Sequence, residues 1–74
     1  MKANDIIEAL ARTPFVPYDI KTSDGRTYAV DHPDFVMRSR DGNTIFLQTD
    51  DDRHIRIDSH HVVAIEDANR PAAA

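Results

Sequence analysis

The sequence predicts a mostly β domain in which a short N-terminal helix precedes five to six antiparallel strands, highly bent into a small barrel. From residue 18 onward, apolar and polar side chains alternate with the period of two that half-buried strands show. Tight-turn signals separate these stretches at Asp24-Gly25, Asp41-Gly42 and 50–52. No second helical segment follows, which excludes a parallel sheet with crossover helices. Short strands joined by hairpins curl into a barrel.

Length and composition favour a single small domain that assembles with copies of itself. The chain has 74 residues, no cysteine and a formal net charge of −4. We place the domain at residues 1–67 and a disordered tail at 68–74. One core of this size rarely contributes more than about 3–5 kcal/mol net. Because disulfides and thiolate zinc sites are excluded, a partner chain is the expected source of further stability.

The N-terminal stretch MKANDIIEAL carries acidic residues inside its apolar run, which is unlike a signal peptide. No apolar stretch approaches the roughly 20 residues that span a bilayer. We therefore expect a cytoplasmic protein without a membrane partner. The acidic balance also argues against non-specific binding along a duplex, which depends on many phosphate contacts.

Residues 4–13 (NDIIEALART) predict one short helix. Asn4 or Asp5 can cap it, and Asp5 with Glu8 has the spacing of a capping box. Pro14 ends it because proline cannot continue the hydrogen-bond ladder. So short a helix is not stable alone in water, so it is expected to dock on the sheet. Its apolar side is formed by Ile6, Ile7 and Leu10.

Residues 18–31 predict a hairpin, with alternating strands on either side of the Asp24-Gly25 turn. Glycine accepts the positive φ that such turns demand. The stretch DHPDF (31–35) then interrupts the pattern, because Pro33 cannot donate to a ladder and holds His32 extended. We expect a bend or bulge inside one long strand, or a short link between two strands.

Four further stretches predict strands, and a polar elbow precedes the last of them. In the stretch RHIRID (53–58), Ile55 and Ile57 face inward, whereas His54 and Arg56 face outward. The elbow is Ser59-His60-His61. The five aromatic side chains are expected in the core, because a small barrel needs its aromatics inside. The stretches are FVMRSR (35–40), NTIFLQT (43–49), RHIRID (53–58) and VVAIE (62–66).

This layout resembles the Sm-like fold, in particular the bacterial Sm-like RNA chaperones, and SH3-like barrels more generally. The match covers residues 4–67, with RTYAVDHPDFVMRSR as the long bent second strand of the family. The elbow DSHHVVAI resembles the family's second motif, with His61 as the motif histidine and His60 in the place of its basic residue. Residues 14–35 also resemble a pattern that recurs in short bacterial proteins.

The resemblance implies a homo-oligomeric ring in which the last two strands of neighbouring copies pair and the elbows line a pore. The candidate oligomer interface is therefore Val62, Val63, Ala64 and Ile65. Single-stranded RNA is one candidate partner, because basic side chains gather in the second half of the chain. The candidate nucleic-acid-binding residues are Arg38, Arg40, Arg53, Arg56, His60 and His61.

The sequence favours a non-catalytic role without metal or cofactor. It has no nucleophile elbow, and both glycines serve turns rather than a phosphate loop. The adjacent His60 and His61 would point to opposite sides if extended, and a metal site needs at least three converging ligands. The alternative function is a monomeric protein-binding adaptor that holds a peptide with a strand edge and the HPDF bend.

Overall fold

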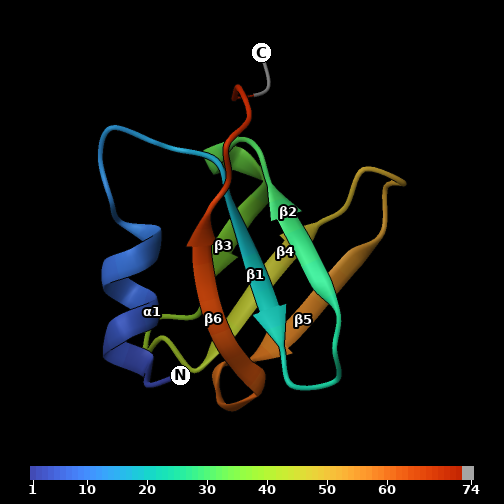
Figure 1. Ribbon diagram of the computed structural model, residues 1–74. Coiled ribbons are helices and arrows are strands. Elements are labelled where there is room, and N and C mark those ends of the chain that lie inside the picture. Colours follow the sequence, from blue (N-terminus) through green and yellow to red (C-terminus); the bar gives the residue numbers. More distant parts are fainter. Residues whose placement is uncertain (73–74) are drawn as a thin grey trace.

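The computed structural model describes residues 1–72 and confirms the mostly β class with one short N-terminal helix. Figure 1 shows helix α1 (Ala3–Leu10) beside the strands. Two 3-10 helices interrupt the strands, η1 (Pro33–Phe35) and η2 (Ser59–His61). The strands are β1 (Tyr18–Thr22), β2 (Thr27–Val30), β3 (Val36–Arg38), β4 (Thr44–Gln48), β5 (His54–Asp58) and β6 (Val62–Asp67).

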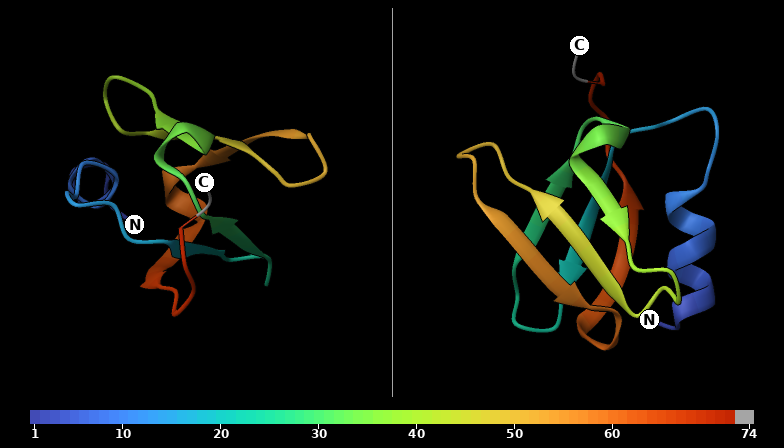
Figure 2. Two further views of the ribbon diagram at one scale, coloured as in Figure 1. Left: turned by 90° about the horizontal axis from the view of Figure 1, so that it is seen from above. Right: turned by 180° about the vertical axis from the view of Figure 1, so that it is seen from behind.

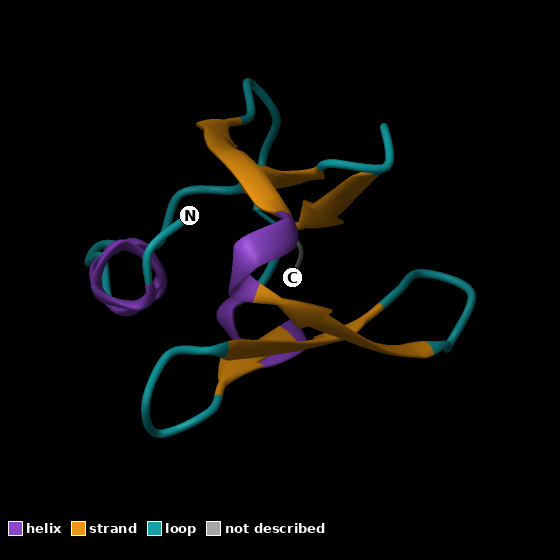
Figure 3. Cartoon of the chain, turned by 90° about the horizontal axis from the view of Figure 1, so that it is seen from below, coloured by secondary structure: helices purple, strands orange, loops and turns teal. Residues whose placement is uncertain are grey.

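The strands form two antiparallel sheets, with the orders β2-β1-β6 and β3-β4-β5. We call them the β1 sheet and the β4 sheet after their central strands. Figure 3 shows the sheets as two layers, with α1 to one side. Within residues 1–72 no strand pairing joins the two sheets, so closure into a barrel stays a prediction.

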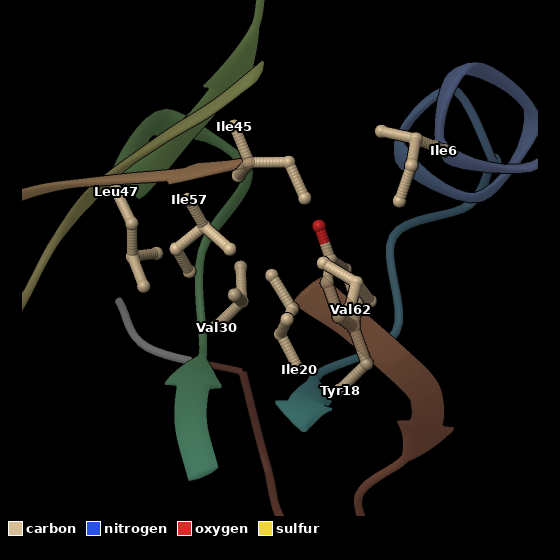
Figure 4. Close-up of a cluster of buried hydrophobic side chains, with 8 residues drawn as sticks. All are labelled: Ile6, Tyr18, Ile20, Val30, Ile45, Leu47, Ile57 and Val62. Atoms are coloured by element: carbon tan, nitrogen blue, oxygen red, sulfur yellow. The ribbon is translucent and has the colours of Figure 1, made fainter. Parts of the chain in front are cut away.

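The core lies between the inner faces of the two sheets (Figure 4). It is built by alternation, since every second side chain of β1 and β4 is buried. Helix α1 contributes Ile6, which is fully buried. The buried apolar side chains are Ile6, Tyr18, Ile20, Val30, Ile45, Leu47, Ile57 and Val62.

The aromatic residues do not all enter this core, contrary to expectation. Tyr18 is buried, but Phe15, Tyr28 and Phe46 are only half-buried and Phe35 is 37% exposed. Strand parity accounts for Phe46, because its neighbours Ile45 and Leu47 are buried and point to the opposite face of the sheet. Phe35 lies in η1, outside any strand, whereas Phe15 and Tyr28 are partly buried and pack against the core.

The stretch after β2 is a link between two strands and not a bend within one. His32 stands at the N-cap of η1, where its Nδ1 accepts a hydrogen bond from the Asp34 main-chain N–H at 3.1 Å. Pro33 begins the 3-10 turn, which proline's fixed φ favours. The single long second strand implied by the Sm-like resemblance is therefore two strands in different sheets.

Helix α1 begins earlier than the capping pattern predicts. Lys2 holds the N-cap position without a side-chain hydrogen bond, so neither Asn4 nor Asp5 caps the helix. The helix docks against the β3–β4 turn, where Gly42 has a φ of +79°. A Cβ at this position would lie 2.7 Å from the Ala3 carbonyl oxygen. No helix within residues 1–72 is long and apolar enough to cross a membrane.

The β1–β2 and β4–β5 turns have the same geometry. The two turns span residues 22–26 and 49–53. In each, the first residue donates its main-chain N–H to the carbonyl of the fifth, and the N–H of the fourth donates to the carbonyl of the first. The fourth residue has a positive φ, +84° at Gly25 and +67° at Asp52. The fifth is an arginine that pairs with the aspartate two positions earlier, Arg26 with Asp24 and Arg53 with Asp51.

The segment after β6 contacts the β1 sheet. The Arg70 guanidinium donates to the carboxylates of Asp19, at 2.8 Å, and of Asp31. It also donates to the Tyr18 carbonyl at 3.3 Å. The predicted tail, 68–74, extends to residues 73–74, which lie outside the described residues.

Candidate functional site

The elbow between β5 and β6 is held by hydrogen bonds to its main chain. The Asp58 carboxylate accepts from the His60 N–H at 2.9 Å, as a cap of η2. The Ser23 N–H donates to the His61 carbonyl at 2.8 Å, and its hydroxyl lies 3.3 Å from His61 Nδ1. Both histidines are exposed. The elbow is therefore a corner braced against the β1–β2 turn, with two imidazoles on its surface.

The candidate basic residues do not form one continuous surface. Arg53 lies at the β4–β5 turn, at the opposite end of β5 from the elbow (Figure 1), and pairs with Asp51 at 2.8 Å. Arg38 donates to the carbonyls of its own turn, at Ser39 and Arg40. Arg56 lies between these ends, on β5. The structure therefore brings these residues together in two separate pairs, Arg38 with Arg40 and His60 with His61.

Strands β5 and β6 each have one edge without a strand partner in the described part of the chain. Strand β6 pairs only with β1, and β5 pairs only with β4. Of the candidate interface residues, Val62 is buried, Ala64 and Ile65 are half-buried, and Val63 is 62% exposed. The ends of β6 touch the N-terminal segment, through Val62 O to the Met1 amino group and through Asp67 to Arg12.

A groove of about 430 Å³ lies against the β4 sheet. Because Ile45, Leu47 and Ile57 are buried, the intervening side chains point to the outer face, which faces the viewer in Figure 2, right. The strand register sets Met37 beside Phe46 and Phe46 beside Arg56. The same face of the groove includes Phe35, Met37, Phe46, Gln48, His54 and Arg56.

Among these groove residues, the sequence singled out Arg56 as a binding candidate, Phe35 only as part of the HPDF bend and His54 only as an outward-facing side chain. The available signal for Phe46 was alternation, because it lies between two buried apolar neighbours and so points away from them. The Asp41-Gly42 turn predicted that β3 and β4 form a hairpin, but not which of their side chains lie side by side.

By contrast, the outer face of the β1 sheet is polar, and its charged side chains form ion pairs. Lys21 on β1 pairs with Glu66 on β6 at 3.0 Å. Arg70 pairs with Asp19 at 2.8 Å and also with Asp31. The side chains of these last three residues are each about one-third exposed or less. Charges on this face are therefore met by charges of the same chain.

The shifted carboxyl pKa values belong to turns and not to the groove or the elbow. Hydrogen bonds within the three hairpin turns lower the pKa of one aspartate in each. The main cause is the Thr22 hydroxyl for Asp24, the Asn43 main-chain N–H for Asp41 and the Thr49 hydroxyl for Asp51. Burial raises the pKa of Tyr18 to about 12. Across residues 1–72, no three histidine, aspartate or glutamate side chains are placed to hold a metal ion together.

The geometry thus offers two features with functional potential: two free strand edges joined by the elbow, and an apolar groove beside Arg56. No family model, curated protein or solved structure matches the chain.

Proposed function

We propose that the chain is a non-catalytic Sm-like small-barrel module that self-assembles into a ring and binds a partner. The observation that carries the proposal is the pair of free edges on β5 and β6. Two different edges on one molecule form a head-to-tail interface, which closes into a ring when the rotation between copies permits. Unpaired edges are otherwise a liability, because their main-chain groups invite pairing with other chains.

The small core supports assembly on energetic grounds. Within residues 1–72 the buried hydrophobic core consists of eight side chains, whereas Ile55 on β5 and Ile65 on β6 stay half-buried beside the free edges. Pairing these edges between copies removes further apolar surface from water, at about 25 cal/mol per Å². It also gives the edge N–H and C=O groups partners that they lack within one copy.

Charge and hydrophobicity favour one orientation for this pairing. An antiparallel pair brings the acidic end of β6, Glu66 and Asp67, beside the start of β5, where Arg53 and His54 lie. Ile65 then lies near Ile55, and Ala64 lies near Arg56. A parallel arrangement would instead bring the acidic end of β6 toward Asp58, where like charges repel. The antiparallel arrangement is therefore the proposed register.

A reciprocal charge exchange tests this register. Light scattering is expected to give a multiple of the 8.4 kDa chain mass for the native protein. Arg53→Glu and Asp67→Arg are each expected to lower the assembled fraction, and the double variant to restore it. Arg26→Glu is the matched control, because Arg26 holds the same position in the equivalent β1–β2 turn. A single 8.4 kDa species at all micromolar concentrations would remove the proposal.

Single-stranded RNA is a proposed partner of the assembled form. A ring repeats the exposed His60 and His61 around its centre, so that a local basic surface arises from several copies. Binding of short single-stranded oligomers is then expected to weaken as salt rises. The absence of any mobility shift at low salt would remove RNA from the proposal and leave the assembly untouched.

A monomeric peptide-binding adaptor is the second candidate, and one observation favours it. The groove on the β4 sheet adjoins the HPDF segment, which contains η1. In this segment the ring centroids of Phe35 and His32 lie 5.5 Å apart. This candidate predicts an 8.4 kDa monomer that binds a protein partner and leaves absorbance at 260 nm unchanged.

A further inference from the structure

The outer face of the β4 sheet exposes apolar side chains that the fold does not need there. Met37 is 63% exposed, and Phe35 lies beside the same groove. Only two other large apolar side chains of the described chain are exposed, Val16 and Val63, and neither lines this groove. A gathered apolar surface with a polar rim is the usual mark of an interaction site.

The side chains along the groove change from apolar on β3 and β4 to basic on β5. One row across the sheet runs Met37, Phe46, Arg56 from β3 to β5. Two positions further along, Gln48 lies beside His54. Methionine and phenylalanine therefore form the β3–β4 side, and basic side chains form the β5 side. Methionine adapts its shape to different partners, and this favours a surface that accepts a ligand.

Arg56 is the charged group of the groove that the chain leaves unpaired. Within residues 1–72 its guanidinium makes no ion pair, whereas Arg53 is held by Asp51 and Arg70 by Asp19. A guanidinium presents a planar fork of donors that matches a carboxylate. The complement to this surface therefore has apolar side chains on one side and a carboxylate on the other.

We propose that the groove binds a short extended peptide of a partner protein, with two apolar side chains over Phe46 and Met37 and a carboxylate on Arg56. The proposal rests on the proposed function in that the module binds a partner. The groove volume of about 430 Å³ lies in the range of about 300–1,000 Å³ that ligand sites occupy. A peptide places alternate side chains on one face, which suits two adjacent apolar positions.

Charge favours a peptide over nucleic acid at this groove. Asp34 lines it, and the adjoining β4–β5 turn carries Asp50, Asp51 and Asp52. A phosphate backbone bears a charge at every nucleotide and would meet these carboxylates. A peptide with one carboxylate satisfies Arg56 without that repulsion.

Docking at the groove is compatible with assembly. The proposed edge pairing places the acidic end of β6 beside Arg53 and His54 and brings Ala64 near Arg56, so no acidic residue of a neighbouring copy occupies that guanidinium. The groove also lies within one copy, because β3, β4 and β5 supply it together. Peptide binding and assembly can therefore succeed or fail separately.

The test uses two pools of capped hexapeptides and amide NMR spectra of the full chain. One pool has Phe, Leu and Asp at three alternate positions, so that all three side chains share one face of the extended peptide, and the other pool has Lys in place of Asp. The Asp pool is expected to shift the amides of Met37, Phe46 and Arg56 and to bind about tenfold more tightly than the Lys pool. Arg56→Glu is expected to reverse this preference.

Two matched variants distinguish binding at the groove from non-specific hydrophobic binding. Met37→Ser is expected to weaken Asp-pool binding about tenfold. Val16→Ser is expected to leave it unchanged, because Val16 is also exposed but lies outside the groove and outside the β5 and β6 edges. Light scattering of the same samples reports assembly independently of these shifts.

Two results would overturn the groove assignment. One is the absence of groove shifts with either pool at millimolar concentration. The other is a groove shift with a short oligouridine and with neither peptide pool, which would make the surface a nucleic-acid site.

Discussion

The two sheets share one plan on their inner faces and differ on their outer faces. Inside, both contribute alternating apolar side chains to a common core. Outside, the β1 sheet carries ion pairs between Lys21 and Glu66 and between Arg70 and Asp19. The β4 sheet carries Met37 and Phe46 with Arg56 unpaired in the described chain. The charges on the outer face of the β1 sheet are paired within the chain, whereas the outer face of the β4 sheet is the proposed peptide site.

With the proposed peptide site on the β4 sheet, this difference separates stability from binding within one small domain. Side chains that pair within the chain contribute to folding, whereas exposed apolar surface costs solubility and is the usual mark of an interaction site. The inner faces of the two sheets should therefore respond alike to substitution, and their outer faces should differ.

The inner faces should respond alike to truncation. Ile20 in the β1 sheet and Ile45 in the β4 sheet are both fully buried. Ile20→Ala and Ile45→Ala are each expected to cost about 3–4 kcal/mol, since each leaves a cavity in the same core. Circular dichroism at low temperature should show a large loss of structure in both. Native spectra for one variant only would contradict a shared core.

The turn glycines should differ, because only one turn packs on the helix. Gly42→Ala in the β4 sheet is expected to cost about 3 kcal/mol, from its positive φ and from the clash with the Ala3 carbonyl. Gly25→Ala is expected to cost about 1 kcal/mol, because open space surrounds it and only φ matters. Urea unfolding measures both, and equal losses would contradict the docking of α1 on the β3–β4 turn.

The outer faces should differ in what a substitution removes. Arg70→Gln is expected to lower the free energy of unfolding by about 1 kcal/mol, because it breaks two partly buried ion pairs. Met37→Ser is expected to change it by no more than about 0.5 kcal/mol, because that side chain is mostly exposed. Thermal unfolding checks both. The reverse order would show that the apolar face is structural.

Acid should lower the stability of both sheets, because their turns contain aspartates with lowered pKa values. This is the smallest of the expected effects. The pKa values of Asp24, Asp41 and Asp51 are lowered by hydrogen bonds, most strongly from the Thr22 hydroxyl in the case of Asp24. Their contribution to stability is complete above the ordinary aspartate pKa of 3.8 and is lost as the pH falls below it. Melting temperatures from pH 6 to pH 3 should therefore fall less steeply for Asp51→Asn than for the native chain. Identical slopes would contradict this contribution.

Local signals in the sequence predicted the short-range features. Asp24-Gly25 and Asp41-Gly42 marked two turns, and both glycines adopt the positive φ that the pattern implies. Alternation placed Ile55 and Ile57 inward and His54 and Arg56 outward, and the burial pattern of β5 confirms this. These features depend on neighbours in the chain, which a sequence contains directly.

Features that depend on distant contacts had no such signal. The start of α1 lies at Ala3 because the helix docks on the β3–β4 turn, so the capping pattern at Asn4 and Asp5 was overridden. The contact of Arg70 with Asp19 joins positions 51 residues apart. The groove likewise requires the β3–β4–β5 register, and the turn signals predict the hairpins but not which side chains lie opposite one another.

The native mass of the purified chain tests the central claim of assembly most directly. The account predicts a multiple of 8.4 kDa that persists across micromolar concentrations. It also predicts that this mass falls for Arg53→Glu and returns when Asp67→Arg is added. A mass of 8.4 kDa at every concentration would contradict assembly through β5 and β6 and would favour the monomeric adaptor instead.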